Sequence, residues 1–174
     1  MRSLLRQALA GQEGLVELRY HGKCFRSLQA EKGILDQASL QRREGIGVRV
    51  LESGTWGFAS TSQLELSSIC TAIEQARHSA RSSAGFRRKQ IPTLPSIPLA
   101  VGDLSQAGVT EVIERSLEER VELVLGMAAH AQGLSSRVSS SRCIYNEIYN
   151  HKAIVTTDGA DVEYKLVRPE FRIQ

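Results

Sequence analysis

Few side chains in this sequence combine a reactive type with a useful spacing. Glu74 and His78 are four residues apart, so a helix would place them on one face, where they could ligate a metal ion. A zinc site needs three or four protein ligands, and the remaining histidines have no matching neighbours in the sequence: His21, His130 and His151. The sequence therefore favours a solvated ion pair over a metal site at these two positions.

The three cysteines, Cys24, Cys70 and Cys143, show no paired spacing. An odd number without a Cys-x-x-Cys pair argues against a disulfide framework and against a zinc knuckle, and it is typical of a reducing cytoplasm. Cys70 falls on the apolar stripe of an expected helix, and Cys143 falls within an expected strand. We interpret both as small buried hydrophobic residues.

The usual catalytic and nucleotide-binding motifs do not occur. The sequence contains no His-Glu-x-x-His, no Gly-x-x-x-x-Gly-Lys-Ser/Thr loop and no Gly-x-Ser-x-Gly elbow. Gly45-Ile-Gly47 is a fragment of a dinucleotide fingerprint, but it opens a strand where that motif opens a helix. We therefore assign no catalytic, no cofactor-binding and no metal-binding residue.

Positive charge gathers at the end of one expected helix, at Arg77, Arg81, Arg87, Arg88 and Lys89. A solvated face that suits the helix dipole is the favoured interpretation, and a nucleic-acid patch is the alternative. No ladder of aromatic residues accompanies the run beyond Phe86. A net charge of +3 is only mildly basic, so we expect no nucleic-acid partner.

Length and composition indicate a globular protein of ordinary kind. The 174 residues, 41% hydrophobic and 24% charged, predict a single domain over residues 1–174. The N-terminal stretch 1–10 is too short for the apolar core of a signal peptide, and no window approaches the ~20 apolar residues of a membrane span. We expect a cytoplasmic protein with no membrane partner.

The stretch Gly45–Thr61 is expected to organise the fold as a hairpin. β-branched residues alternate along its first half, a Glu52-Ser53-Gly54 turn follows, and a second strand runs back. Trp56 and Phe58 lie two apart, and so on one face of that strand. An open face would make them a ligand or partner surface. We expect the hairpin near the centre of the sheet, with both aromatic residues holding the sheet to its helices.

Around this hairpin, segments with the hydrophobic period of a strand alternate with segments that have the period of a helix. Strands are expected over residues 15–20, 23–31, 34–41, 138–145, 153–156 and 161–167, with turns at 21–22, 32–33 and 157–160 and a connection over 146–152. Helices are expected over residues 2–10, and after the capping boxes Ser62–Glu65 and Ser116–Glu119. Residues 109–115 continue the last helix as its first turn or form a separate piece.

Residues 85–108 form the one irregular stretch. Pro92, Pro95 and Pro98 recur every third residue, which blocks helix and favours extended chain. A connector over the surface is the favoured interpretation, and a proline-rich ligand for another domain is the alternative. The predicted fold class is α+β: a largely antiparallel β-sheet with two longer helices packed on one face.

Three segments resemble one known family. The run Glu44-Gly-Ile-Gly-Val-Arg-Val50, followed by Gly54-Thr-Trp-Gly-Phe-Ala-Ser-Thr61, resembles the N-terminal domain of the TldD/PmbA family. Residues 116–123 resemble the second helix of that domain, and residues 156–163 resemble the strand, turn and strand that follow. Order and spacing agree from about Leu15 to Glu163, and the Trp-Gly-Phe-Ala-Ser-Thr run is the most specific part.

The resemblance implies a cytoplasmic bacterial or archaeal peptidase. In this family a TldD-type subunit carries a zinc-dependent active site and pairs with a related TldE/PmbA-type subunit. Members act on unfolded peptides, including antibiotic precursors and antitoxins, and are also described as modulators of DNA gyrase. The family's His-Glu-x-x-x-His helix belongs to the C-terminal half of a chain more than twice this long, and no His-Glu pair occurs here. Zinc is therefore expected only in that C-terminal domain, and no catalytic residue is carried over.

Two main hypotheses follow from the residues and the resemblance. The leading one is a non-catalytic N-terminal domain that shapes the peptide cleft and pairs with a TldD/TldE-type subunit, binding unfolded peptide at a sheet edge. The alternative is a stand-alone interaction module that dimerises through an uncovered sheet face or edge. Autonomous hydrolysis would need a metal site that the sequence does not offer. A fragment and a natural stand-alone domain are both compatible with the sequence.

Overall fold

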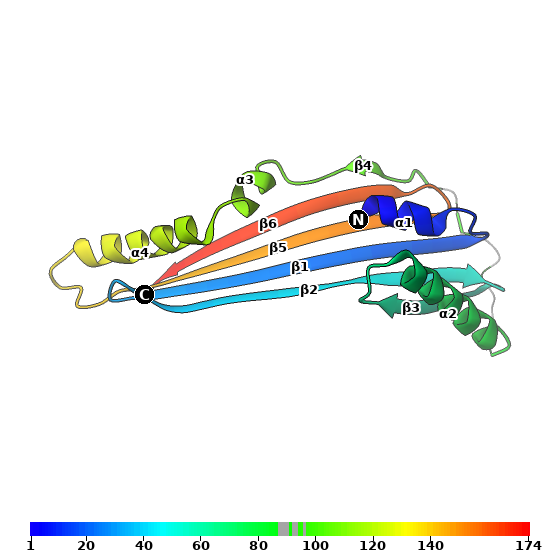
Figure 1. The fold of residues 1–174 in the computed structure, drawn as a ribbon, viewed down its shortest axis with the longest axis horizontal. Helices are drawn as coiled ribbons and strands as arrows, with labels where there is room; N and C mark the ends of the chain where they lie inside the picture. The colour runs from blue at the N-terminus through cyan, green and yellow to red at the C-terminus, as the bar shows by residue number, and fades with distance from the viewer. Residues whose placement is uncertain (87–90, 92–93, 96) are drawn as a thin grey trace. The chain divides into compact units, whose positions relative to one another are not determined.

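The computed structural model describes residues 1–86, 91, 94–95 and 97–174 (Figure 1). Contacts within the described chain divide it into two compact units. The first unit contains Met1–Gly22, Glu44–Ser105 and His151–Tyr164, and the second contains Lys23–Arg43, Gln106–Asn150 and Lys165–Gln174.

The fold combines one sheet with four helices. The helices are α1 (Arg2–Leu9), α2 (Leu66–Ala84), α3 (Val109–Ile113) and α4 (Leu117–Gly133). The strands are β1 (Leu15–Glu31), β2 (Ile34–Glu52), β3 (Thr55–Thr61), β4 (Val101–Asp103), β5 (Arg142–Thr156) and β6 (Asp161–Ile173). They form a sheet of order β3-β2-β1-β5-β6-β4, in which β2 and β3 are antiparallel and β4 and β6 are parallel. The predicted α+β class with a largely antiparallel sheet and two longer helices, α2 and α4, is confirmed.

The core of the first unit lies between the sheet and helices α1 and α2. The strands contribute Val16, Leu18, Tyr20, Ile46, Val48, Val50, Ala153 and Val155, and the helices contribute Leu5, Ala8, Leu9, Ile69, Ala72, Ile73 and Ala76. On α2 these residues recur at a spacing of three and four, which makes one stripe on a helix. Each fully buried large aliphatic side chain contributes about 1.5–3 kcal/mol, so this stripe fixes α2 on the sheet.

Gly57 on β3 determines how closely α2 approaches the sheet. A Cβ atom placed on Gly57 would lie 1.8 Å from the carbonyl oxygen of Ala76 and 2.7 Å from the backbone nitrogen of Ala80. Both neighbours are backbone atoms of α2, which have no flexible end that could move away. A glycine at this position therefore allows the helix backbone to rest directly on the strand.

Gly57→Ala should destabilise the chain by at least about 2 kcal/mol, because the added methyl group forces α2 away from β3. Gly47→Ala is the matched control, since its Cβ would meet only the Arg19 carbonyl oxygen, at 4.0 Å. Denaturant unfolding of both variants measures the difference. Equal stability of the two variants would contradict the close packing of α2 on β3.

Two predicted breaks in the strands are wrong. A turn was expected at His21-Gly22, but β1 continues through it, and a Cβ on Gly22 would lie 2.3 Å from the Tyr20 hydroxyl. Gly22 thus makes room for a ring on the same strand. A connection was expected over residues 146–152, but β5 runs through them. Their polar side chains pair across the sheet, as His151 Nε2 does with Glu163 Oε1 at 2.5 Å.

The two predicted capping boxes have different outcomes. Ser116 begins α4 with its hydroxyl accepting from the Glu119 N–H, and the Glu119 side chain accepts from the Ser116 N–H, so this box is confirmed. Helix α2 begins later than expected, with Glu65 at its N-cap and no side-chain cap. The Thr61 hydroxyl accepts the Gln63 N–H, which turns the chain before the helix can start.

The described part of residues 85–108 is largely extended. Pro95 and Pro98 lie outside any helix, and Pro92 falls outside the described residues. Ile91 donates its N–H to the Gly54 carbonyl at 2.9 Å, and β4 pairs with residues 161–163 of β6. The sequence did not predict β4, because three residues are too few to show a period of two.

Candidate functional site

Strand β3 lies at an edge of the sheet, so the hairpin is not central as predicted. Its residues alternate in burial: Thr55 and Gly57 are buried beneath α2, while Phe58 is 64% exposed and Trp56 is half-buried. The prediction that Trp56 and Phe58 hold the sheet to its helices is therefore wrong. They project from the face opposite α2, which was the alternative interpretation.

The backbone of β3 leaves hydrogen-bonding groups on an edge that no described strand covers. Glu52 pairs with Thr55 across the Ser53-Gly54 turn, both of whose central residues have positive φ (50° and 68°). Such a turn closes with a hydrogen bond between its first and fourth residues. From there on, residue pairs that exchange hydrogen bonds alternate with pairs that do not. The pairs that do not exchange hydrogen bonds hold Trp56, Phe58 and Ser60. Their N–H and C=O groups therefore point away from β2.

A polar groove adjoins this edge on the α2 side. It has a volume of about 330 Å³ and is lined by Ser60, Thr61, Gln63, Ser68, Thr71, Ala72 and Gln75. Most of these side chains carry a hydroxyl or an amide, and none is charged. Such groups can donate and accept hydrogen bonds without selecting a charge, which suits contact with peptide groups or small polar side chains.

The face opposite α2 carries charge and aromatic surface, and we call it the open face: Glu17, Arg19, Arg49, Trp56 and Phe58. Glu17 accepts hydrogen bonds from Arg19 Nε and from Arg49 Nη2, the latter at 2.8 Å. The Arg49 guanidinium carbon lies 4.4 Å from the centre of the Trp56 ring, in a cation–π contact. Arg49 Nε is buried and makes no hydrogen bond within the part of the chain that the structure describes. No sequence motif indicated these charged residues. Strand alternation does place them on the face opposite the buried Val16, Leu18 and Val48.

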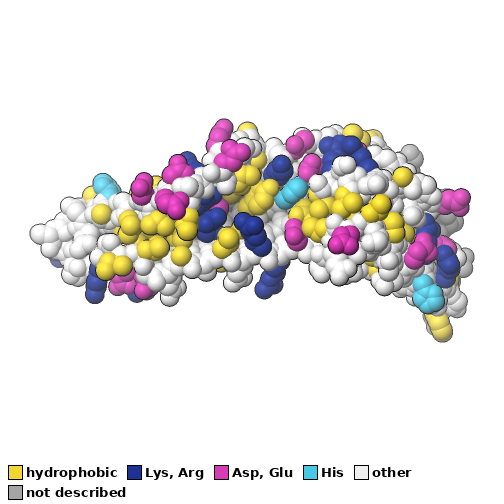
Figure 2. Space-filling model, viewed as in Figure 1, with side chains coloured by type: hydrophobic (Ala, Val, Ile, Leu, Met, Phe, Trp, Pro, Cys, Tyr) yellow, Lys and Arg dark blue, Asp and Glu magenta, His cyan; other side chains and the backbone are white. Residues whose placement is uncertain are grey.

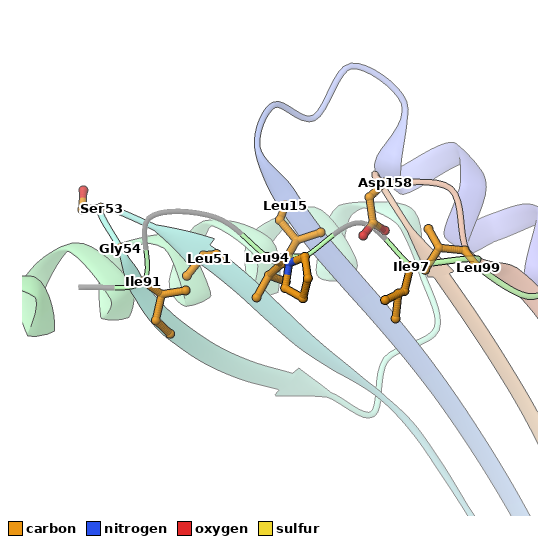
Figure 3. A pocket seen from close by; sticks show the side chains of 10 residues that line it. Leu15, Leu51, Ser53, Gly54, Ile91, Leu94, Ile97, Leu99 and Asp158 are labelled. Carbon is orange, nitrogen blue, oxygen red and sulfur yellow. The ribbon is translucent and has the colours of Figure 1, made fainter. Parts of the chain in front are cut away.

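A second hollow, of about 600 Å³, is lined mostly by residues with apolar side chains (Figure 3). Leu15 and Leu51 of the strands, the Ser53-Gly54 turn, Asp158 and the described connector residues Ile91, Leu94, Pro95, Ile97 and Leu99 line it. Asp158 is the one ionisable side chain among these lining residues, so the hollow offers no pair of groups for acid–base chemistry. It can hold an apolar side chain, and we assign it no reaction.

The second unit contains a buried ionic network that serves structure. Arg120, only 1% exposed, donates from Nε and Nη2 to the two Glu147 carboxylate oxygens at 3.0 and 3.1 Å. Its guanidinium also donates to the backbone carbonyls of Val112 (2.6 Å) and Ser116 (3.2 Å), which ties α3 to α4. The Tyr145 hydroxyl donates a hydrogen bond to Glu147 at 2.5 Å. The pKa of Tyr145 is raised to about 12, mainly by burial and secondly by this hydrogen bond.

Apolar packing surrounds this network. Leu28 and Ala30 of β1, Val124 and Ala128 of α4, and Cys143 and Tyr145 of β5 form the core of the second unit. Beside α4, Figure 2 shows a group of hydrophobic side chains with acidic side chains above them. Leu117 is 46% exposed on this helix, so α4 does not bury its whole apolar surface.

Glu147→Gln should cost about 3–5 kcal/mol of stability, because it leaves the buried Arg120 guanidinium without a counter-charge. Glu170→Gln is the matched control: its ion pair with Arg172 is exposed, and such pairs contribute at most about 1 kcal/mol. Denaturant unfolding compares the two variants. Similar small effects for both would show that the buried pair does not hold α4.

The residues singled out from the sequence do not assemble into a catalytic or metal site. Glu74 forms an ion pair with Arg77 at 3.6 Å, and His78 is exposed. Cys143 is buried as predicted, and burial raises the pKa of its thiol, whereas Cys70 and Cys24 are half-buried. Arg77 and Arg81 form ion pairs with Glu52 at 3.1 and 2.5 Å, and the rest of the basic run, Arg87, Arg88 and Lys89, falls outside the described residues.

The described residues do not fit a zinc ion. Nowhere in the described part of the chain do three His, Cys, Asp or Glu side chains come close enough together to hold a metal. The zinc implied by the family resemblance therefore has no ligand set among these residues. None of the described helices combines the length and the apolar character that a membrane span requires.

Comparison with known proteins places the chain in one protein family. The family model described as PmbA/TldA metallopeptidase domain 1 matches residues 16–80, and the model of the PmbA/TldA metallopeptidase central domain matches residues 111–174. The chain belongs to the PmbA/TldD family. The two matched ranges do not coincide with the two units, since residues 23–43 of the second unit lie in the first match. A single domain over residues 1–174 stays a prediction.

Several relatives share the sequence or the fold. A metalloprotease of Methanocaldococcus jannaschii is 19% identical over 142 residues, which cover 82% of this chain and 31% of the relative. The crystal structure of a proposed modulator of DNA gyrase from Bacteroides thetaiotaomicron matches with a TM-score of 0.67 and 17% identity, over 99% of this chain and 39% of that one. TldE from Thermococcus kodakarensis matches with a TM-score of 0.62 and 15% identity, over 100% and 42%. The chain thus spans less than half the length of these relatives.

Proposed function

We propose that this chain is a non-catalytic N-terminal part of a PmbA/TldD-type metallopeptidase that forms one wall of a cleft for unfolded peptide. The observation that carries the proposal is the free edge of β3, seven residues long, which ends the sheet in the first unit. An exposed edge strand is a template for a further strand, because its N–H and C=O groups have no partner strand.

An extended peptide can add to this edge through its main chain. Trp56, Phe58 and Ser60 offer outward N–H and C=O groups, and peptide side chains on the α2 side would enter the groove of hydroxyl and amide groups. Main-chain hydrogen bonds supply affinity without regard to sequence, and side-chain pockets add selectivity. This chemistry suits a protein that handles many unfolded peptides in proteolysis or peptide maturation.

The remaining parts of the activity are proposed to lie elsewhere. We expect zinc and its ligands in the C-terminal part of the family, so that this chain by itself does not cleave peptides. We further propose a cytoplasmic location and pairing with a related TldD/TldE-type subunit. The gyrase names belong to the relatives that carry them, and proteolysis is the role proposed here.

The same edge supports a second candidate function, a stand-alone dimerisation module. Two copies of β3 can pair antiparallel about a two-fold axis, since the outward residues alternate along the strand. Sedimentation separates the candidates: a monomer that binds peptide fits the cleft wall, and a dimer without peptide affinity fits the module.

Ser60→Pro should weaken binding of an extended peptide about tenfold, because proline removes the outward N–H and its ring blocks the added strand. Ser60→Ala is the matched control, since it removes the hydroxyl and keeps the N–H. The probe is a capped ten-residue peptide of alternating threonine and glutamine, titrated against the 174-residue chain by calorimetry. Equal affinities for the two variants, or no binding to the unmodified chain, would refute the proposed cleft wall.

A further inference from the structure

The open face of the first unit differs from the β3 edge in both position and chemistry. Its residues project from the sheet on the side away from α2, with Phe58 directly opposite Arg49 in the β2–β3 register. Phe58 is 64% exposed, and the Arg19 side chain is 57% exposed. An aromatic ring and a guanidinium are thus both available to a partner on the same surface.

The charges of this face do not balance. Glu17 is the single carboxylate in the cluster, and it is shared by the guanidinium groups of Arg19 and Arg49. A third cation, Lys152, lies 5.6 Å from the centre of the Tyr164 ring in the same unit. Lys152 precedes the buried Ala153, so strand alternation directs it away from the core. Among these named residues, three cations therefore accompany a single carboxylate.

The position of Arg49 is fixed in advance of any binding. The Trp56 ring lies against its guanidinium, and Glu17 accepts from Nη2, so little side-chain freedom remains to be lost. Its Nε is buried and has no hydrogen-bond acceptor among the described residues. A guanidinium held in this way is suited to receive a carboxylate, with which arginine forms its strongest and most directional hydrogen bonds.

We propose that the open face docks a polypeptide segment in which a carboxylate side chain lies next to an apolar one. The carboxylate pairs with Arg19 and Arg49, and the apolar side chain covers Phe58. Single-stranded nucleic acid fits less well, because Arg49 already occupies one side of Trp56 and leaves Phe58 as the one widely exposed ring of the cluster. This docking goes beyond the proposed cleft wall, since it uses the face of the sheet and not the β3 edge.

Trp56 is the only tryptophan of the chain, so its fluorescence reports directly on this face. The probes are a capped eight-residue peptide in which two leucines followed by two glutamates occur twice, so that each face of an extended chain carries leucine beside glutamate, the same peptide with glutamine in place of glutamate, and an eight-residue oligothymidylate. We expect the glutamate peptide to bind the 174-residue chain at least about tenfold more tightly than the glutamine peptide at low salt, with the difference shrinking as salt is added.

Variants tie the preference to the face. Arg19→Gln and Phe58→Ser should each weaken binding of the glutamate peptide about fivefold, whereas the matched controls Arg172→Gln and Phe86→Ser should leave it unchanged. Arg172 is exposed in the second unit, and Phe86 is 91% exposed beyond the end of α2. Arg19→Gln alters an exposed side chain, so it provides a test even if Phe58→Ser perturbs folding.

Three results would overturn the proposal: equal affinity for the glutamate and glutamine peptides, no loss of affinity in Arg19→Gln, or tighter binding of the oligothymidylate. The glutamate preference should persist in Ser60→Pro, which blocks only the β3 edge. A preference that disappears in Ser60→Pro while Arg19→Gln has no effect would assign the carboxylate to the edge and refute docking on the open face.

Discussion

The arrangement of the first unit depends on the contact between Gly57 of β3 and the backbone of α2. Because glycine has no side chain, the Ala76 carbonyl can lie where a Cβ would otherwise be. The helix therefore covers one face of the edge strand at close range. As a result, the aromatic residues on either side of Gly57 must project from the opposite face, and none of the described strands pairs with the outer edge of β3. Both candidate surfaces of the protein follow from this single contact.

Periodicity and local motifs in the sequence predicted much of the fold. The capping box of α4 is a local pattern that appears as predicted. The apolar stripe on α2 is confirmed except at the half-buried Cys70, and the turn of the hairpin is confirmed except that Glu52 belongs to β2. The long strands could not be predicted in full, because a run of polar residues inside a strand resembles a loop in the sequence. Some of these polar residues, such as those of 146–152, make polar contacts within the fold. Glu147 lies in a strand and meets a buried arginine from α4, and a pairing between residues 27 positions apart leaves no local signal.

The type of candidate site, a sheet edge, was predicted from the sequence, but its location in the sheet was not. The family resemblance and the principle of strand addition indicated a sheet edge, and the structure has a free edge at β3. The orientation of Trp56 was predicted wrongly, because a large aromatic residue in a strand is usually core. The register contained the missing information: a two-residue turn pairs Gly57 with Val50, so the apolar face of β2 continues through the glycine and not through the tryptophan.

The most direct test of the β3 edge is amide hydrogen exchange of β3, measured by NMR with and without the threonine–glutamine peptide. In the free chain the N–H groups of Gly57 and Ala59 should already be protected by β2, and those of Trp56, Phe58 and Ser60 should exchange quickly. Peptide addition should slow exchange at these three outward amides and leave the two inward ones unchanged. Protection that stays the same at Trp56, Phe58 and Ser60 while the peptide is bound would contradict strand addition at this edge.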